Sequence, residues 1–147
     1  MKQLIIFGLT LLIMSSDYET QKYEVVLKDS NFEIRYYPPA IKAKVLSENG
    51  SNNNFMKLFK YISGNNSNNE KIKIYESEAG YYASVRFGGY GNRKKVKNYS
   101  DILYNKLDKL NIKHIGSPYF VSYNSPYKVF NRRNEVMIKI DYKTNPQ

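Results

Sequence analysis

The chain has 147 residues, of which 41% are hydrophobic and 15% aromatic, and these proportions predict one folded domain rather than a disordered chain. It contains no Cys, which excludes disulfides, thiolate catalysis and metal centres held by Cys. The formal net charge is +10. The basic residues are scattered and carry no recognisable nucleic-acid signature, so we predict no nucleic-acid partner. The electrostatic field of the net positive charge also favours an anionic small ligand.

The N-terminus has the pattern of an export signal. Lys2 precedes an apolar run over residues 4–14, which has the length of a signal peptide core and is too short to span a bilayer comfortably. Ser15 and Ser16 follow the run as small residues. We predict a secretory signal over residues 1–16 and an exported protein, periplasmic or secreted, with no stable membrane domain after its removal. The alternative is an uncleaved N-terminal anchor.

Three strands are predicted after the signal. Apolar and polar residues alternate over residues 23–28, 32–37 and 40–46, as they do in strands with one buried face. Pro38 and Pro39 separate the second strand from the third, because proline has no N–H to donate to the ladder.

Helical and strand patterns alternate in the middle of the chain. Apolar residues at helical spacing from Phe55 to Ile62 predict a short amphipathic helix between two Asn-rich loops. Two strands are then predicted over residues 71–76 and 81–87, and a glycine-rich turn follows them. The strongest helical pattern covers residues 99–110.

The C-terminal quarter and an internal repeat predict the fold class. Two strands begin at Tyr119 and Phe130, and an Arg-Arg-Asn-Glu cluster occupies residues 132–135. Residues 34–45 align with residues 74–85, and each copy leads through a polar loop into an amphipathic helix. Two such units predict a single α+β domain with pseudo-two-fold symmetry, in which two α-helices flank a curved antiparallel sheet or distorted barrel.

Five segments resemble motifs of the SOUL family of haem-binding proteins and occur in the family's order. The last of them runs from a Tyr-Asn-x-Pro loop into Arg-Arg-Asn-Glu-Val, and Gly88 stands where the family usually has Ser. The segments cover residues 23–26, 32–39, 55–64, 83–89 and 123–136. The resemblance identifies residues 23–142 as a SOUL-type domain and implies the architecture that SOUL proteins share with multidrug-binding barrels.

The resemblance implies non-covalent binding of haem or a related tetrapyrrole in a hydrophobic cleft, as carrier or buffer and not as an enzyme. The matching positions lie on the first helix and in the loop after Tyr123, where Lys128 could add a further cation for the propionates. The implied site residues are Phe55, Leu58, Phe59, Ile62, Pro126, Tyr127, Phe130, Arg132 and Arg133.

Simpler interpretations compete with these assignments. The helix residues could be ordinary core, and Arg132, Arg133 and Glu135 could form an ion-pair and hydrogen-bond cluster that pins the last strand. His114, the only histidine, lies in a predicted helix-to-strand loop outside the family motifs, so we do not predict it as an axial ligand. The sequence selects no Tyr as a ligand either, and binding without a protein axial ligand stays open.

The first repeat is short of strands. Family members usually carry two further strand segments after the first helix, whereas here residues 69–72 pass straight into residues 73–76. An unpaired sheet edge would invite pairing with another chain, which predicts a homodimer or a frayed edge. Two other functions remain open: a small-molecule sensor of the multidrug-binding barrel type, or a structural or interaction protein that has lost the pocket.

Overall fold

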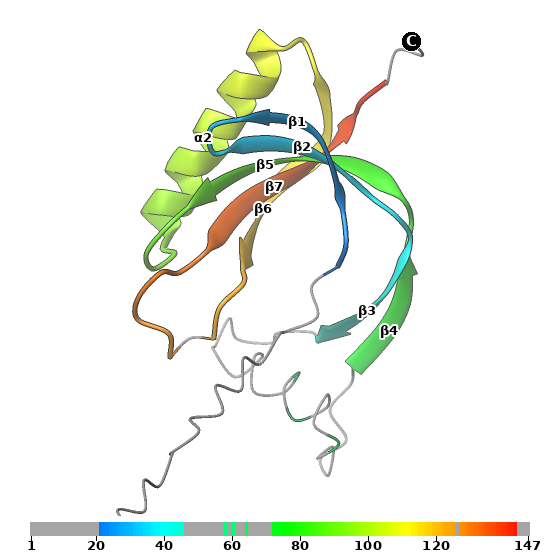
Figure 1. Ribbon diagram of the computed structural model, residues 1–147, viewed down its shortest axis with the longest axis vertical. Coiled ribbons are helices and arrows are strands. Elements are labelled where there is room, and N and C mark those ends of the chain that lie inside the picture. Colours follow the sequence, from blue (N-terminus) through cyan, green and yellow to red (C-terminus); the bar gives the residue numbers. More distant parts are fainter. Residues whose placement is uncertain are drawn as a thin grey trace, which may run out of the picture.

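The computed structural model of the chain describes residues 21–45, 58, 60, 64, 72–125 and 127–143. Within these residues it contains seven strands and one long helix (Figure 1). In chain order they are β1 (Glu24–Asp29), β2 (Phe32–Tyr37), β3 (Ala40–Val45), β4 (Ile72–Ser77), β5 (Gly80–Phe87), α2 (Arg93–Lys109), β6 (Lys113–Ser122) and β7 (Asn134–Asp141). The predicted signal over residues 1–16 lies outside the described residues.

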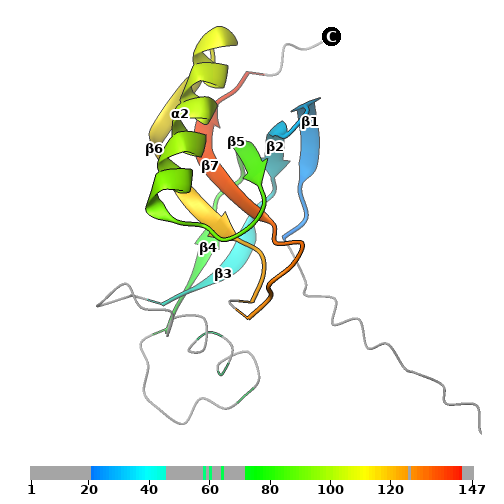
Figure 2. The ribbon, with the colours of Figure 1, turned by 90° about the vertical axis from the view of Figure 1, so that its left-hand side faces the viewer.

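The strands form two antiparallel sheets. The larger sheet has the order β1-β2-β5-β7-β6, and β3 pairs with β4 in a separate two-stranded sheet. Helix α2 covers one face of the larger sheet, while the β3–β4 arm bends toward the opposite face (Figures 1 and 2). The predicted α+β class with a mainly antiparallel sheet is therefore confirmed.

The core lies between α2 and the larger sheet. Leu103 and Leu107 are one helical turn apart on α2 and are fully buried. They pack against alternate residues of the strands, because a strand turns every second side chain to the same face. These strand residues are Phe32, Ile34, Ala83, Val85, Phe87, Val136, Ile138 and Ile140.

Helix α2 begins earlier than the pattern over residues 99–110 predicts. The Asn92 side chain accepts a hydrogen bond from the Lys95 backbone N–H at 2.9 Å, which caps the helix at its N-terminus. The basic residues that follow therefore form the first turn, which the apolar pattern does not reveal. Of the predicted apolar face, Leu103 and Leu107 are buried, whereas Ile102 remains largely exposed.

The two sheets are parts of one long bent hairpin. Strand β2 pairs with β5 with Tyr37 opposite Gly80, and β3 pairs with β4 with Ala40 opposite Ser77. The pairing register is the same before and after the unpaired residues between these strands, so the bend introduces no shift in the hydrogen-bonded ladder. The gap contains Pro38 and Pro39, and the predicted interruption of the ladder is confirmed there.

Several expectations need correction. The described strands do not close into a barrel. One helix, α2, is described in full; the helix predicted from Phe55 to Ile62 falls mostly on residues outside the description, of which Leu58 and Lys60 are described and helical. Strand β6 begins at Lys113 instead of Tyr119, so His114 lies in a strand and not in a loop.

The second C-terminal strand also begins later than predicted. Strand β7 starts at Asn134 rather than Phe130, because Arg132 and Arg133 bond to the preceding loop before the ladder begins.

In the described part of the chain, no helix combines the length and apolarity needed to cross a bilayer.

Candidate ligand-binding site

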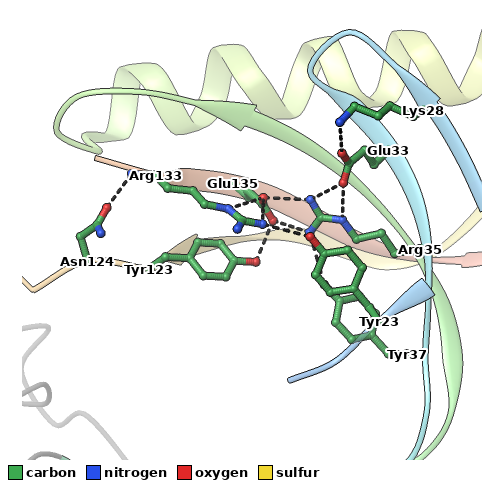
Figure 3. A network of polar contacts seen from close by, with 9 residues as sticks. All are labelled: Tyr23, Lys28, Glu33, Arg35, Tyr37, Tyr123, Asn124, Arg133 and Glu135. Atoms are coloured by element: carbon green, nitrogen blue, oxygen red, sulfur yellow. Dashed lines mark hydrogen bonds and ion pairs between the residues drawn. The ribbon is translucent and has the colours of Figure 1, made fainter. Parts of the chain in front are cut away.

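A buried ion pair lies at the centre of the larger sheet, on the face opposite α2 (Figure 3). Arg35 of β2 donates Nη1 to Glu135 Oε2 at 2.6 Å and Nη2 to Glu135 Oε1 at 2.9 Å. Both side chains are inaccessible, at 2% and 0% exposure. The two-point geometry gives each charge its partner where water is excluded.

Glu135 accepts further hydrogen bonds from two residues of the loop between β6 and β7. Arg133 Nη2 donates to Oε1 at 2.8 Å, and the Tyr123 hydroxyl donates to Oε2 at 2.7 Å. Burial alone would raise the pKa of Glu135, but the hydrogen bonds from Arg35 and Tyr123 outweigh it and lower the pKa to about 2. Glu135 is therefore a carboxylate at every physiological pH.

The interpretation of Arg132, Arg133 and Glu135 as an ion-pair and hydrogen-bond cluster is confirmed, with the ion pair between Arg133 and Glu135. Arg132 instead donates to the carbonyl oxygens of Ser125 and Lys128, at 3.0 and 2.6 Å. The sequence analysis missed Arg35, the principal partner of Glu135. The alternating pattern of a strand predicts that its charged residues face solvent. The only signal in the sequence was the position of Arg35 in the family's Phe-Glu-Ile-Arg motif.

A pocket of about 220 Å³ lies beside this network. The network and the pocket lie on the same face of the larger sheet, because successive residues of a strand point to opposite faces. On β7, Met137 faces the pocket, whereas Val136 and Ile138 face α2. Its walls come from β2, β3, β5, β6, β7 and the segment before β1. The lining residues are Gln21, Tyr23, Tyr37, Lys42, Tyr82, Tyr119, Val121, Tyr123, Arg133 and Met137.

The pocket combines aromatic walls with positive charge. Five tyrosines line it, and the Tyr37 ring meets the Tyr82 ring edge-on with centroids 5.5 Å apart. Arg133 is largely compensated by Glu135, whereas Lys42 forms no ion pair with any described residue. Such a surface fits a planar, mainly apolar ligand that carries an anionic group.

Three of the tyrosines that line the pocket have a raised pKa. Burial raises the pKa of Tyr119 to about 12 and also raises the pKa of Tyr37. Burial and the hydrogen bond to Glu135 raise the pKa of Tyr123.

The described residues offer little else to a metal. They contain no cluster of three His, Asp or Glu side chains, and His114 does not line the pocket. Its ring packs against Tyr104 of α2, with centroids 5.0 Å apart, on the helix side of the sheet.

The predicted site residues do not all gather in one place. Arg133 lines the pocket, whereas Tyr127 and Phe130 do not and are 77% and 81% exposed. Leu58 is half-buried. The remaining predicted residues, Phe55, Phe59, Ile62 and Pro126, lie outside the described residues, so their assignment stays a prediction.

The pocket residues that the sequence analysis missed include Tyr23, Tyr37, Lys42, Tyr82 and Tyr119. A signal existed in the strand alternation, since each of the four tyrosines lies on a predicted strand at a position that faces away from the core. The 15 tyrosines of the chain gave no means of choosing among them.

An antiparallel sheet with a helix on one face and an aromatic pocket on the other defines a small α+β domain with an open site. The sequence profile described as SOUL heme-binding protein matches residues 18–75 and 67–139, and the chain belongs to this family. The two matches overlap at residues 67–75. The comparison with curated proteins gave no match.

Proposed function

We propose that this protein binds haem or a related tetrapyrrole non-covalently, as a carrier or buffer, in the tyrosine-lined pocket. Membership of the SOUL family suggests haem as the ligand. The observation that carries the proposal is the pocket itself, in which five tyrosines surround space beside Lys42 and Arg133. Rings of this kind pack on a flat π-surface, and cations pair with carboxylates such as the propionates.

The pocket's size sets the expected mode of binding. Its volume of about 220 Å³ is below the roughly 300–1,000 Å³ of typical ligand sites. The described residues would therefore cover only part of a tetrapyrrole, and one propionate edge would face Lys42. On this proposal, recognition rests on the ring and its acid groups and not on the iron.

A titration of the full chain with hemin and with metal-free protoporphyrin IX tests this proposal. We expect saturable one-to-one binding of both, followed by the Soret band, with affinities within about tenfold of each other. Saturable binding of hemin alone would contradict recognition through the ring and propionates. No binding of either by a folded sample would overturn the proposal and favour an interaction protein without a pocket.

Two matched tyrosine variants locate the site. Tyr119→Leu removes a ring from the pocket wall, and Tyr127→Leu removes one from the exposed loop. We expect Tyr119→Leu to weaken hemin binding and Tyr127→Leu to leave it unchanged. The reverse result would keep haem as the ligand but move it to the predicted site around the first helix and the loop.

A smaller ligand is the second candidate, and the pocket's limited volume favours it. On this proposal the protein is a small-molecule sensor of the multidrug-binding barrel type, which takes a planar aromatic anion of one or two rings. A competition experiment separates the two candidates. An aromatic acid that displaces protoporphyrin and binds more tightly would establish the smaller ligand.

The pseudo-two-fold architecture remains a proposal that the hairpin supports. The repeat relates Pro38 and Pro39 to Glu78 and Ala79, which are the residues that face each other across the bend. A two-fold axis through the bend would relate β2 to β4 and β3 to β5.

The homodimer is also a proposal, and the edge of β3 is where it would form. Strand β5 has β2 on one side and β7 on the other, whereas β3 pairs with β4 and with no other described strand. An open edge of this kind can add a strand from another chain.

We also propose that the protein is exported by its N-terminal segment, which protease accessibility of the intact cell's surface or periplasm would test.

A further inference from the structure

One end of the molecule presents large apolar side chains to solvent. Tyr127, Val129 and Phe130, in the loop between β6 and β7, are 77%, 59% and 81% exposed. Tyr90, in the loop between β5 and α2, is 51% exposed. Figures 1 and 2 show these two loops at the same end of the molecule. We call Tyr90, Tyr127, Val129 and Phe130 the aromatic end.

The loop that carries three of these residues has a defined shape. Arg132 donates to two carbonyl oxygens of the loop, and the Arg133 backbone N–H donates to Asn124 Oδ1 at 2.6 Å. The Arg132 guanidinium also lies 4.5 Å from the centre of the Tyr90 ring, which joins the two loops. Polar contacts thus hold the apolar side chains outward, where no described residue buries them.

The charge around the aromatic end has one sign. Residues 88–97 and 123–133 contain no Asp or Glu. Arg93, Lys94 and Lys95 form the first turn of α2, and Lys128 lies within the loop. Positive side chains at a helix N-terminus oppose the helix dipole, so helix stability does not account for this cluster.

We propose that the aromatic end docks on the surface of an anionic lipid bilayer. Tyr127, Val129 and Phe130 enter the interface, where aromatic side chains partition favourably. The cations of α2 and the loop pair with anionic headgroups, which attract basic side chains near such a surface. A second copy of this chain is a poorer occupant, because two surfaces of the same positive sign repel.

The absence of Trp from the chain allows a direct test. In the full chain, Phe130→Trp creates a single fluorescent reporter at the aromatic end. We expect its emission to shift to shorter wavelength with vesicles of phosphatidylcholine and phosphatidylserine, and not with phosphatidylcholine alone. High salt should reduce the shift by screening the headgroups. The matched control is Ile115→Trp. Ile115 is 52% exposed and lies on β6, at the end far from both loops. The emission of this variant should not shift with vesicles.

A second pair of variants keeps the inference falsifiable if the apolar N-terminal run itself binds lipid. Tyr127→Ser with Phe130→Ser should weaken sedimentation with anionic vesicles by roughly tenfold or more, from the loss of two buried rings. Ile115→Ser should leave it unchanged. Equal shifts from both reporters, no shift at position 130, or unchanged sedimentation of the double variant would each overturn the inference. A doubled mass by light scattering that the double variant abolishes would assign the end to self-association instead.

Discussion

At the residue scale, the polar interior depends on Glu135. Its two oxygens accept hydrogen bonds from Arg35, Arg133 and Tyr123, and the carboxylate has no access to water. Arg35 in turn has Glu33 as a second partner, at 2.7 Å. Removing one member of such a network leaves the others buried without compensation.

Glu135→Gln is expected to destabilise the fold by about 3–5 kcal/mol, because it leaves the Arg35 charge buried without its main partner. Urea unfolding, followed by far-UV circular dichroism, measures the change. Asp101→Asn is the matched control, since Asp101 pairs with Lys97 on the exposed surface of α2. The control should cost less than about 1 kcal/mol. Equal effects of the two substitutions would show that the buried pair contributes no more than an exposed one.

The same residue predicts an acid limit for the fold. The folded-state pKa of Glu135 is about 2, below its ordinary value of 4.5, so the unfolded chain binds the proton more readily. The stabilisation is complete above pH about 4.5 and is lost as the pH falls toward 2. The urea concentration at the unfolding midpoint should decrease for the wild type as the pH is lowered from about 4.5 toward 2. For Glu135→Gln, the midpoint should change less over the same range. Parallel curves for both proteins would argue against Glu135 as the cause.

At the element scale, α2 and the bent hairpin behave differently. Helix α2 is supported by its own cap, by Leu103 and Leu107, and by the five-stranded sheet. Strand β3 has one described neighbour and carries exposed Ile41 together with Lys42 and Lys44. The helix should therefore tolerate local change better than the β3 edge.

The cap of α2 makes one prediction. Asn92→Ala removes the acceptor of the Lys95 N–H and should cost about 1 kcal/mol in unfolding free energy. Asn92→Asp keeps the acceptor and adds a negative charge beside three basic residues and the helix N-terminus. It should therefore match or exceed the wild type. Thermal unfolding of the three proteins ranks them, and a wild-type midpoint for Asn92→Ala would show that the cap is dispensable.

The β3 edge predicts an unusual salt dependence for the proposed homodimer. Pairing of two β3 edges would bring Lys42 and Lys44 of both copies together, and their repulsion is screened by salt. Self-association measured by analytical ultracentrifugation should therefore rise with ionic strength. Lys42→Thr with Lys44→Thr should dimerise at low salt, while Lys94→Thr with Lys95→Thr should behave as the wild type. A dimer that salt weakens would have to form elsewhere.

At the scale of the whole molecule, the two faces of the larger sheet have separate tasks. One face packs on α2 and forms the core, while the other carries the ion-pair network and the tyrosine pocket. The β3–β4 arm bends toward the second face and brings Lys42 to the pocket (Figure 1). The aromatic end lies where the β5–α2 and β6–β7 loops meet, so the proposed binding in the pocket and the proposed docking on lipid can be tested separately.

The sequence by itself determined the α+β class, the family, the strands of the hairpin and the break at Pro38 and Pro39. Each of these depends on local periodicity, on a short motif or on the chemistry of a single residue type. Only the tertiary structure decided that Arg35 meets Glu135, 100 residues away, and which tyrosines share a pocket. Such contacts depend on strand order and register, and a strand's own alternation states which residues share a face but not which strand lies beside it.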